Sequence, residues 1–329
     1  MRILVTGGAG FIGSNFVRSC LDGKLGLPNI SSLKVLDSLT YSGNLRNLDS
    51  VIEDPRLEVI IGSICDSEVV NSVMTDIDFV VHFAAESHVD RSISTASVFI
   101  QTNVGGTLTL LESAVKHKIT RFVHVSTDEV YGSIREGSWD ENAPLLPNSP
   151  YSASKASSDL IVRSFVKTHG LDAVVTRCSN NYGPFQFPEK VIPLFATNLI
   201  QNLNMPIYGD GKNCRDWLHV EDHCRGIALA LVGGTSGEVY NFGGGQELSN
   251  IELSEYIASH FGRSASEMID FVEDRKGHDF RYSVDHSKAS RELGYIPLIN
   301  FEEGIADTLR WYEENRGWWE PLQTNRQSS

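Results

Sequence analysis

The chain has 329 residues, of which 41% are hydrophobic, and it carries 28 Lys and Arg against 42 Asp and Glu, a formal net charge of −14. This length suits one large or two medium domains, at about 100–200 residues each. A strongly acidic chain is a poor partner for nucleic acids and anionic membranes, so we expect neither as a ligand.

The cysteines and the beginning of the chain bear on the cellular compartment. The five cysteines are scattered and form no C-x-x-C pair, which is typical of reduced thiols and argues against a disulfide framework or a zinc site. Met1 leads directly into strand-like sequence without a signal peptide, and no apolar run approaches the ~18 residues of a membrane span. We therefore expect a cytoplasmic protein without a metal centre.

A strand and a glycine-rich turn open the chain. The β-branched segment from Arg2 to Thr6 predicts a strand, and Gly7, Gly10 and Gly13 follow it with G-x-x-G-x-x-G spacing before a helix-like segment. Such glycines allow a tight turn and a close approach to a pyrophosphate, whose charge then faces amides at a helix N-terminus. The pattern predicts a dinucleotide site; the alternative is a plain glycine turn.

An acid ends the next predicted strand, which runs from Leu33 to Leu36. This residue, Asp37, lies 24 positions beyond Gly13. An acid in that place can hydrogen-bond an adenosine ribose and repel a 2′-phosphate, so it favours NAD over NADP. The alternative is a surface aspartate that binds no ligand.

Strand and helix then alternate along the first half of the chain. Short apolar runs predict strands, and apolar residues at helical spacing predict the helices between them. This alternation indicates an α/β fold with a doubly wound parallel sheet of the Rossmann type. The predicted strands are 57–61, 79–83, 121–125 and 174–178, and the predicted helices are 14–21, 66–74 and 103–116.

The stretch from Ser126 to Gly132 follows the predicted buried strand 121–125. It carries two adjacent acids, Asp128 and Glu129, after a pair of hydroxyl residues. Open α/β sheets bind ligands at the carboxyl ends of their strands, and carboxylates are rarely buried without a partner. The stretch therefore indicates chemistry, with a solvated exit from the strand as the alternative.

Tyr151 and Lys155 are four residues apart, so on a helix they share one face. An ammonium beside a phenol, near an oxidised nicotinamide, favours the phenolate and lowers the pKa of the tyrosine. The alternative is an ordinary amphipathic helix with the tyrosine packed and the lysine solvated. The dinucleotide motif upstream favours the catalytic interpretation.

Regular alternation weakens after the strand 174–178, where two consecutive amides, Asn180 and Asn181, suit a ligand with many hydroxyls. His219 alternates with apolar residues, so we interpret it as a core residue rather than a catalytic one. We place the domain change here. The predicted divisions are an NAD-binding domain over 1–180, to which about 219–240 returns, a smaller α/β substrate domain over 181–218 and 241–322, and a disordered tail over 323–329.

These motifs together resemble the extended short-chain dehydrogenase/reductase superfamily. Within it, the stretches His88 to Ser92, Ser126 to Gly132 and Asp274 to His278 look like those of the dTDP-glucose 4,6-dehydratases, and the resemblance runs from about Met1 to Trp319. The acid pair is its most specific part. Relatives that epimerise C4 lack the pair, and the GDP-mannose dehydratases keep the glutamate without the aspartate.

The resemblance implies conversion of dTDP-glucose to dTDP-4-keto-6-deoxyglucose and water, with NAD bound as a prosthetic group. Tyr151 would remove the proton of the C4 hydroxyl, with Lys155 at the nicotinamide ribose and Thr127 at the C4 oxygen. Glu129 would take the C5 proton, and Asp128 would protonate the departing C6 hydroxyl. Neighbours in a regular strand point to opposite faces, so both acids must lie past its last regular position.

The resemblance also implies contact residues and an assembly. Family members are usually homodimers, joined here through helices at 108–115 and 157–166, although such helices could equally be core. The implied cofactor contacts are Gly7, Gly10, Phe11, Ile12, Gly13, Asp37, Ser38, Leu39, Thr40, Ser63, Ile64, Phe83, Ala84, Ala85, Ser87, Thr102, Tyr151, Lys155 and Asn181. The implied substrate contacts are Ser87, Thr127, Asn180, Lys190, Val191, Pro206, Tyr208, Arg215, Asn250, Arg275, His278 and Tyr282.

The sequence departs from the family pattern at two positions. Ser63 stands where the family usually has an aspartate that meets the adenine amine, so adenine binding is expected to be weaker or water-mediated. Lys276 replaces a common proline, with little expected consequence.

Two other functions stay open. A C4 epimerase or a decarboxylase of nucleotide sugars could use the same scaffold but would not need Asp128. An NAD-binding sensor or scaffold would have no use for the intact catalytic set, which is Thr127, Asp128, Glu129, Tyr151 and Lys155.

Overall fold

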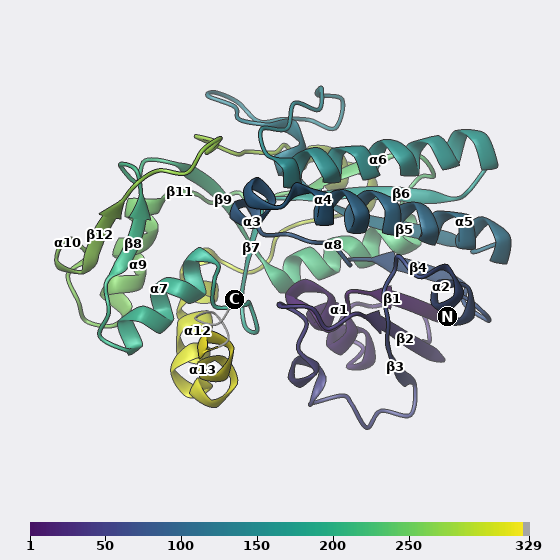
Figure 1. The fold of residues 1–329 in the computed structure, drawn as a ribbon, viewed down its shortest axis with the longest axis horizontal. Coiled ribbons are helices and arrows are strands. Elements are labelled where there is room, and N and C mark those ends of the chain that lie inside the picture. The colour runs from purple at the N-terminus through teal and green to yellow at the C-terminus, as the bar shows by residue number, and fades with distance from the viewer. Residues whose placement is uncertain (325–329) are drawn as a thin grey trace.

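The computed structural model, which describes residues 1–324, contains a seven-stranded parallel sheet at its centre (Figure 1). The strands run in the order β3-β2-β1-β4-β5-β6-β10, so the chain changes direction across the sheet between β1 and β4. Their bounds are β1 Arg2–Thr6, β2 Ser32–Asp37, β3 Leu57–Ile61, β4 Phe79–His82, β5 Arg121–Thr127, β6 Ala173–Cys178 and β10 Val239–Phe242. The predicted doubly wound α/β fold is confirmed.

Helices cover both faces of this sheet because its strands are apolar on both sides. In β1, Ile3 and Val5 pack against α1 (Phe11–Leu21) and α8 (Val220–Gly233), whereas Leu4 packs into the opposite layer. That opposite layer is built on α2 (Ser67–Val73), α5 (Thr107–His117) and α6 (Pro150–His169). Shorter segments join these elements: η1 Leu45–Leu48, α3 Val89–Ser94, α4 Ala96–Phe99 and η2 Ile100–Gly106.

The predicted helix 103–116 is divided in the structure. Its first residues belong to η2, a π-helical segment, and the regular helix α5 starts only at Thr107. Gly106 lies against Ile64, and a β-carbon on it would be 2.5 Å from the Ile64 side chain. Wider π-helical turns of this kind often occur beside functional sites.

The remaining elements form the smaller part of the molecule, at the left of Figure 1. A second core fills the space between its helices and its two small sheets, with orders β11-β9-β7 and β12-β8. The strands are β7 Asn180–Tyr182, β8 Met205–Tyr208, β9 Cys214–His219, β11 Glu247–Ser249 and β12 Ile269–Val272. The helices are α7 Val191–Ile200, α9 Asn250–His260, α10 Ala265–Met268, α12 Phe301–Glu314 and α13 Arg316–Thr324, and α11 Ser287–Leu293 packs beside β10.

The chain crosses between the two parts more than once. After β9 it enters α8 and β10, which belong to the large sheet and its helical layer. The division at residue 180 and the return over about 219–240 stay predictions. The structure differs from the predicted disordered tail at residues 323 and 324, which continue helix α13; residues 325–329 lie outside the described part. No helix among the described residues combines the length and apolar character needed to cross a membrane.

Candidate active site

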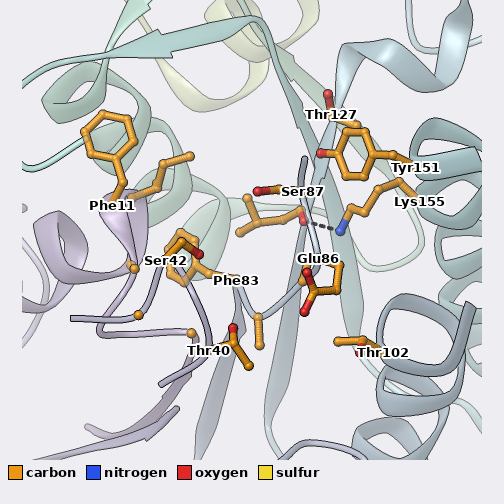
Figure 2. Close-up of a pocket in the computed structure, with 18 of the residues that line it drawn as sticks. Phe11, Thr40, Ser42, Phe83, Glu86, Ser87, Thr102, Thr127, Tyr151 and Lys155 are labelled. Atoms are coloured by element: carbon orange, nitrogen blue, oxygen red, sulfur yellow. Dashed lines mark hydrogen bonds between the residues drawn. The ribbon is translucent and has the colours of Figure 1, made fainter. Parts of the chain in front are cut away.

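A cavity of about 530 Å³ lies at the carboxyl ends of the central strands. Its walls include the turn after β1, the segments that follow β2, β4 and β6, and one face of α6. Figure 2 shows the side chains that converge on it from these elements. The cavity spans the point between β1 and β4 where the strand order reverses, which is where doubly wound sheets bind ligands.

The glycine turn leaves backbone groups open to this cavity. Gly7 has a φ of +72°, and a β-carbon on it would lie 2.6 Å from the Ala84 nitrogen. A β-carbon on Gly13 would lie 2.2 Å from the Gly7 carbonyl oxygen. Helix α1 begins after Gly10, and no side chain caps its first amides. This turn fits a pyrophosphate held by main-chain N–H groups.

Asp37 is buried beside the same turn, at the end of β2. Its carboxylate accepts hydrogen bonds from the amides of Ala9 (2.9 Å) and Leu39 (2.8 Å). Burial raises the pKa of Asp37, and these two bonds oppose the rise. Since a carboxylate has about four lone-pair sites, it can also accept a ribose hydroxyl.

The acid pair lies just beyond a regular strand, as the mechanistic assignment requires. Strand β5 ends at Thr127, and Asp128 begins the 3₁₀ turn η3 (Asp128–Tyr131). The Thr127 hydroxyl accepts the amide of Glu129 at 3.3 Å, which fixes the start of that turn. Both acids line the cavity.

The two neighbouring carboxyls have different surroundings. Burial raises the pKa of Asp128 well above its ordinary value, and the charges of Glu129 and Asp216 add to the rise. Burial also raises the pKa of Glu129, but Arg275 and Lys190 oppose the effect. These opposing influences favour a protonated Asp128 beside an ionised Glu129.

Helix α6 places Tyr151 and Lys155 one turn apart on its buried face. Ser149 and Ser152 form a capping box at its start, with Pro150 in the first turn. The Lys155 ammonium donates to the Val125 carbonyl at 2.9 Å, the dashed line in Figure 2. Burial lowers the pKa of Lys155 to about 8.

The predicted lowering of the Tyr151 pKa applies to a site that holds an oxidised nicotinamide, and the protein alone acts on this pKa in the other direction. Burial raises it well above its ordinary value, the nearby Glu129 charge adds to the rise, and the Thr127 hydroxyl opposes it. The Lys155 ammonium donates to the backbone of β5. A cationic ring bound beside Tyr151 would lower its pKa by Coulomb attraction.

Most of the predicted contact residues converge on the cavity. Every predicted cofactor contact lines it except Leu39, which instead supports Asp37 through its amide. Of the predicted substrate contacts, Ser87, Thr127, Asn180 and Lys190 line it. The others belong to the smaller part and are not among the lining residues: Val191, Pro206, Tyr208, Arg215, Asn250, Arg275, His278 and Tyr282.

Several of these outer residues contact one another. The Arg215 guanidinium lies 4.6 Å from the centre of the Tyr282 ring, and His278 meets the Tyr208 ring edge-on at 6.2 Å. Arg215 and Arg275 both act on the charge of Glu129. These two arginines therefore place positive charge next to the acid pair.

The lining residues that the sequence analysis missed include Tyr41, Gln101 and Phe187. The Tyr41 ring contacts Phe187 edge-on at 5.8 Å, and the Arg91 guanidinium lies 4.0 Å from its centre. Tyr41 follows the predicted run 37–40 directly, so extending that run would have found it. Phe187 offers no local signal, because only the tertiary fold brings it to this wall.

The described residues contain no group of three or more His, Cys, Asp and Glu side chains placed to hold a metal ion. The polar side chains that line the cavity include acids, hydroxyls and lysines.

Comparison with known proteins gives close matches over almost the whole chain. The family model for GDP-mannose 4,6 dehydratase matches residues 4–308. A dTDP-glucose 4,6-dehydratase of Actinoplanes sp. is 57% identical over 320 residues, which are 97% of this chain and 100% of that protein. The crystal structure of DesIV, a dTDP-glucose 4,6-dehydratase from Streptomyces venezuelae with NAD and TYD bound, is 58% identical with a TM-score of 0.97 and covers 98% of this chain and 100% of its own.

The same backbone also resembles enzymes with another activity. UDP-glucose 4-epimerase from Thermotoga maritima, solved with UDP-glucose, has a TM-score of 0.88 at 30% identity, over 96% of this chain and 100% of that one. The fold alone therefore does not separate elimination from epimerisation, and residues inside the cavity must do so.

Proposed function

The chain belongs to the GDP-mannose 4,6-dehydratase family, and we propose that it is an NAD-dependent dTDP-glucose 4,6-dehydratase. The reaction converts dTDP-glucose to dTDP-4-keto-6-deoxyglucose and water, a carbon–oxygen hydro-lyase step in deoxysugar biosynthesis. The relatives with identities of 57% and 58% support this substrate. The acid pair Asp128 and Glu129, in one cavity with Tyr151 and Lys155, is the observation that carries the proposal.

NAD fits the large-domain side of the cavity. Gly7, Gly10 and Gly13 leave room for a pyrophosphate, and Asp37 lines the cavity beside them, where its carboxylate can accept a ribose hydroxyl. An acid at this position disfavours a 2′-phosphate, so the residues fit NAD better than NADP. Bound NAD would accept a hydride from C4 of the glucosyl ring and later return it to C6.

The first half of the reaction oxidises C4. Tyr151, as phenolate, takes the proton of the C4 hydroxyl, and the Thr127 hydroxyl beside it orients the C4 oxygen. Lys155 is held by Val125, and its charge supports the phenolate. The resulting 4-ketone makes the neighbouring C5 hydrogen acidic.

The second half eliminates water and uses the acid pair. Glu129 takes the C5 proton while Asp128 gives a proton to the C6 hydroxyl, so the C6–O bond breaks and water leaves. Glu129 then returns its proton to C5 as C6 is reduced, which completes the product. The redox balance is closed within the site, and no external reductant is needed.

One assay tests this proposal directly. The purified protein is incubated with glucose linked to dTDP, UDP or GDP, and separately with UDP-glucuronic acid, and the product is identified by mass and by its 4-keto group. We expect a product lighter by one water with dTDP-glucose. A product of unchanged mass with inverted C4 would instead identify an epimerase, and loss of carbon dioxide from a uronic acid substrate would identify a decarboxylase.

We also propose a homodimer in the cytoplasm. The face formed by η2, α5 and α6 exposes Ile100 (50%), Leu108 (37%) and Leu160 (55%), and these helices lie side by side in Figure 1. A second copy would cover this apolar face. All five cysteines are free, which suits a reducing compartment.

The dimer is tested at the α6 part of that face. Leu160→Glu places a charge there, so we expect a dimer of the wild type to dissociate to monomers in sedimentation experiments. Leu298→Glu is the matched control, since Leu298 is 69% exposed elsewhere and its replacement should leave the assembly unchanged. A monomeric wild type, or a dimeric Leu160→Glu variant, would contradict this assembly.

A further inference from the structure

Asp216 is a further buried carboxyl residue near the acid pair, and it is outside the set of residues used for the reaction. Asp216 is on β9 and is only 3% exposed. Strand β9 pairs with β7, so the residue after Asp216, Trp217, stands opposite Asn180 at the cavity wall. In Figure 1 these two strands run between the large sheet and the smaller part.

Backbone amides hydrogen-bond both oxygens of this carboxylate. Oδ2 accepts the amide of Gly244 at 3.0 Å, and Oδ1 accepts the amide of Gln246 at 2.9 Å. Because hydrogen bonds from N–H groups stabilise the charged form of a carboxyl, these two bonds favour an ionised Asp216. Burial raises the pKa of Asp216, and these bonds oppose that rise.

Two glycines make this arrangement possible. A β-carbon on Gly243 would lie 2.9 Å from the Asp216 carboxylate, and one on Gly244 would lie 1.8 Å from the Trp217 carbonyl oxygen. The 243–246 backbone can reach Asp216 only without side chains there. The fold thus fixes a negative charge at a defined place beside the catalytic wall.

The strand register brings Asp128 near this carboxylate. Thr127 of β5 stands opposite Cys178 of β6, and Asn180 of β7 stands opposite Trp217 of β9, so Asp128 and Asp216 both lie beside the segment 178–180. The groups that face Asp128 are Glu129 on its own turn, Asp216 and Arg215 on β9, Tyr151 on α6 and Cys178 on β6. Its Oδ1 accepts a long hydrogen bond from Thr127 (3.4 Å), and its Oδ2 has no hydrogen-bond partner among the described residues. Arg215 is the one cation in this group, and it donates to the backbone carbonyls of Cys214 and Asp279.

We propose that Asp216 is a positioning residue whose fixed negative charge keeps Asp128 protonated for the elimination of water. The inference rests on the proposed function, because it concerns the acid that releases the C6 hydroxyl. It explains why a buried anion is maintained next to another carboxyl, where it would otherwise only destabilise. Oxidation at C4 depends on Tyr151 and Lys155 and is not expected to need Asp216.

The proposal predicts a shift in pH dependence. Asp128 must be protonated to act, so dehydration is lost as the pH rises through its pKa. Asp216→Asn removes the fixed charge and lowers the pKa of Asp128. The alkaline limb of the dehydration rate should therefore shift to lower pH by about one pH unit. KM should change little. Above the limb, oxidation should continue while elimination stalls, visible as accumulating NADH absorbance.

Glu247→Gln is the matched control. Glu247 stands directly opposite Asp216 in the β9–β11 pair, but its carboxylate is held by Arg281 at 2.6 Å. The control removes the same charge from the adjacent position and should leave the limb in place. An equal shift in both variants would attribute the effect to net charge and overturn the proposal.

The remaining outcomes separate this inference from the proposed function. Asp128→Asn should abolish the alkaline limb; a limb that survives there overturns the acid assignment and with it the role of Asp216. In another outcome, Asp128→Asn abolishes the alkaline limb but Asp216→Asn does not move it. This result overturns the role of Asp216 and leaves Asp128 as the acid. If Asp216→Asn does not fold, Asp216→Ser lets water bridge the two amides. Failure of both to fold would assign Asp216 to loop architecture and overturn the proposal.

Discussion

At the scale of single residues, Asp128 and Glu129 show how chain neighbours acquire different chemistry. The turn after β5 places both in one wall, and burial with two nearby anions acts on Asp128, whereas cations face Glu129. Removing the Glu129 carboxyl should therefore block the transfer of the C5 proton, and removing the Asp128 carboxyl should block protonation of the C6 hydroxyl. This difference makes the two roles separable by experiment.

Neutral isosteres provide that separation. Glu129→Gln should lower the dehydration rate about 10²–10⁴-fold, the usual size of a lost general base. Asp128→Asn should slow elimination to a similar degree but leave C4 oxidation intact, so reduced cofactor accumulates in a single turnover. Asp307→Asn, an exposed acid on α12, is the control and should behave as wild type. A Glu129→Gln variant that dehydrates at the wild-type rate would show that Glu129 is not the base.

The acid side of the pH profile reports on Glu129. It must be ionised to take the C5 proton, so activity falls as the pH drops through its raised pKa. Arg275 favours the ionised form; Arg275→Met should therefore raise that pKa and move the acid limb of kcat upward by about one pH unit. Measurement of kcat at saturating substrate keeps weaker binding out of the result. An acid limb that does not move would show that another group limits the rate.

At the scale of elements, local sequence specified the first half of the site well. The glycine turn, Asp37 and the Tyr151–Lys155 pair each depend on spacing within one element, so their places could be predicted. The positions of Phe187, in the loop between β7 and α7, and of Asp216 near Asp128 could not be predicted in this way. These residues reach the site only through the packing of the smaller part on the large sheet, which no local pattern encodes.

The η2–α5 junction was also not predicted, and it can be tested at two adjacent glycines. Gly106→Ala would press on Ile64, which lines the cofactor side of the cavity. We expect a loss of about 1–3 kcal/mol in stability from overpacking and weaker NAD binding in titrations. Gly105→Ala is the control, since its added methyl would meet only the Ile100 carbonyl oxygen at 4.0 Å. Equal NAD affinity in both variants would show that Ile64 has room to move.

At the scale of the whole molecule, hydrogen bonds connect the last helix to the glycine turn at the start of the chain. The Trp318 indole N–H donates to the Asn47 side chain at 3.0 Å, and the Asn47 amide donates to the Ala9 carbonyl in the glycine turn at 2.8 Å. Trp318 and Asn47 are 6% and 2% exposed. Helix α13 is therefore linked to the cofactor turn through one buried amide, over more than 300 residues of sequence.

This link predicts that a change in the last helix weakens cofactor binding at the first turn. Trp318→Phe removes the indole N–H and leaves the buried Asn47 oxygen without that donor, which should cost about 1–3 kcal/mol of stability. Since Asn47 also holds Ala9, NAD affinity should fall together with the thermal midpoint. Trp311→Phe trims the neighbouring indole, which packs on Phe185 at 4.6 Å, and should leave NAD affinity unchanged. If Trp318→Phe loses stability but binds NAD as tightly as wild type, then α13 supports the fold without reaching the cofactor turn.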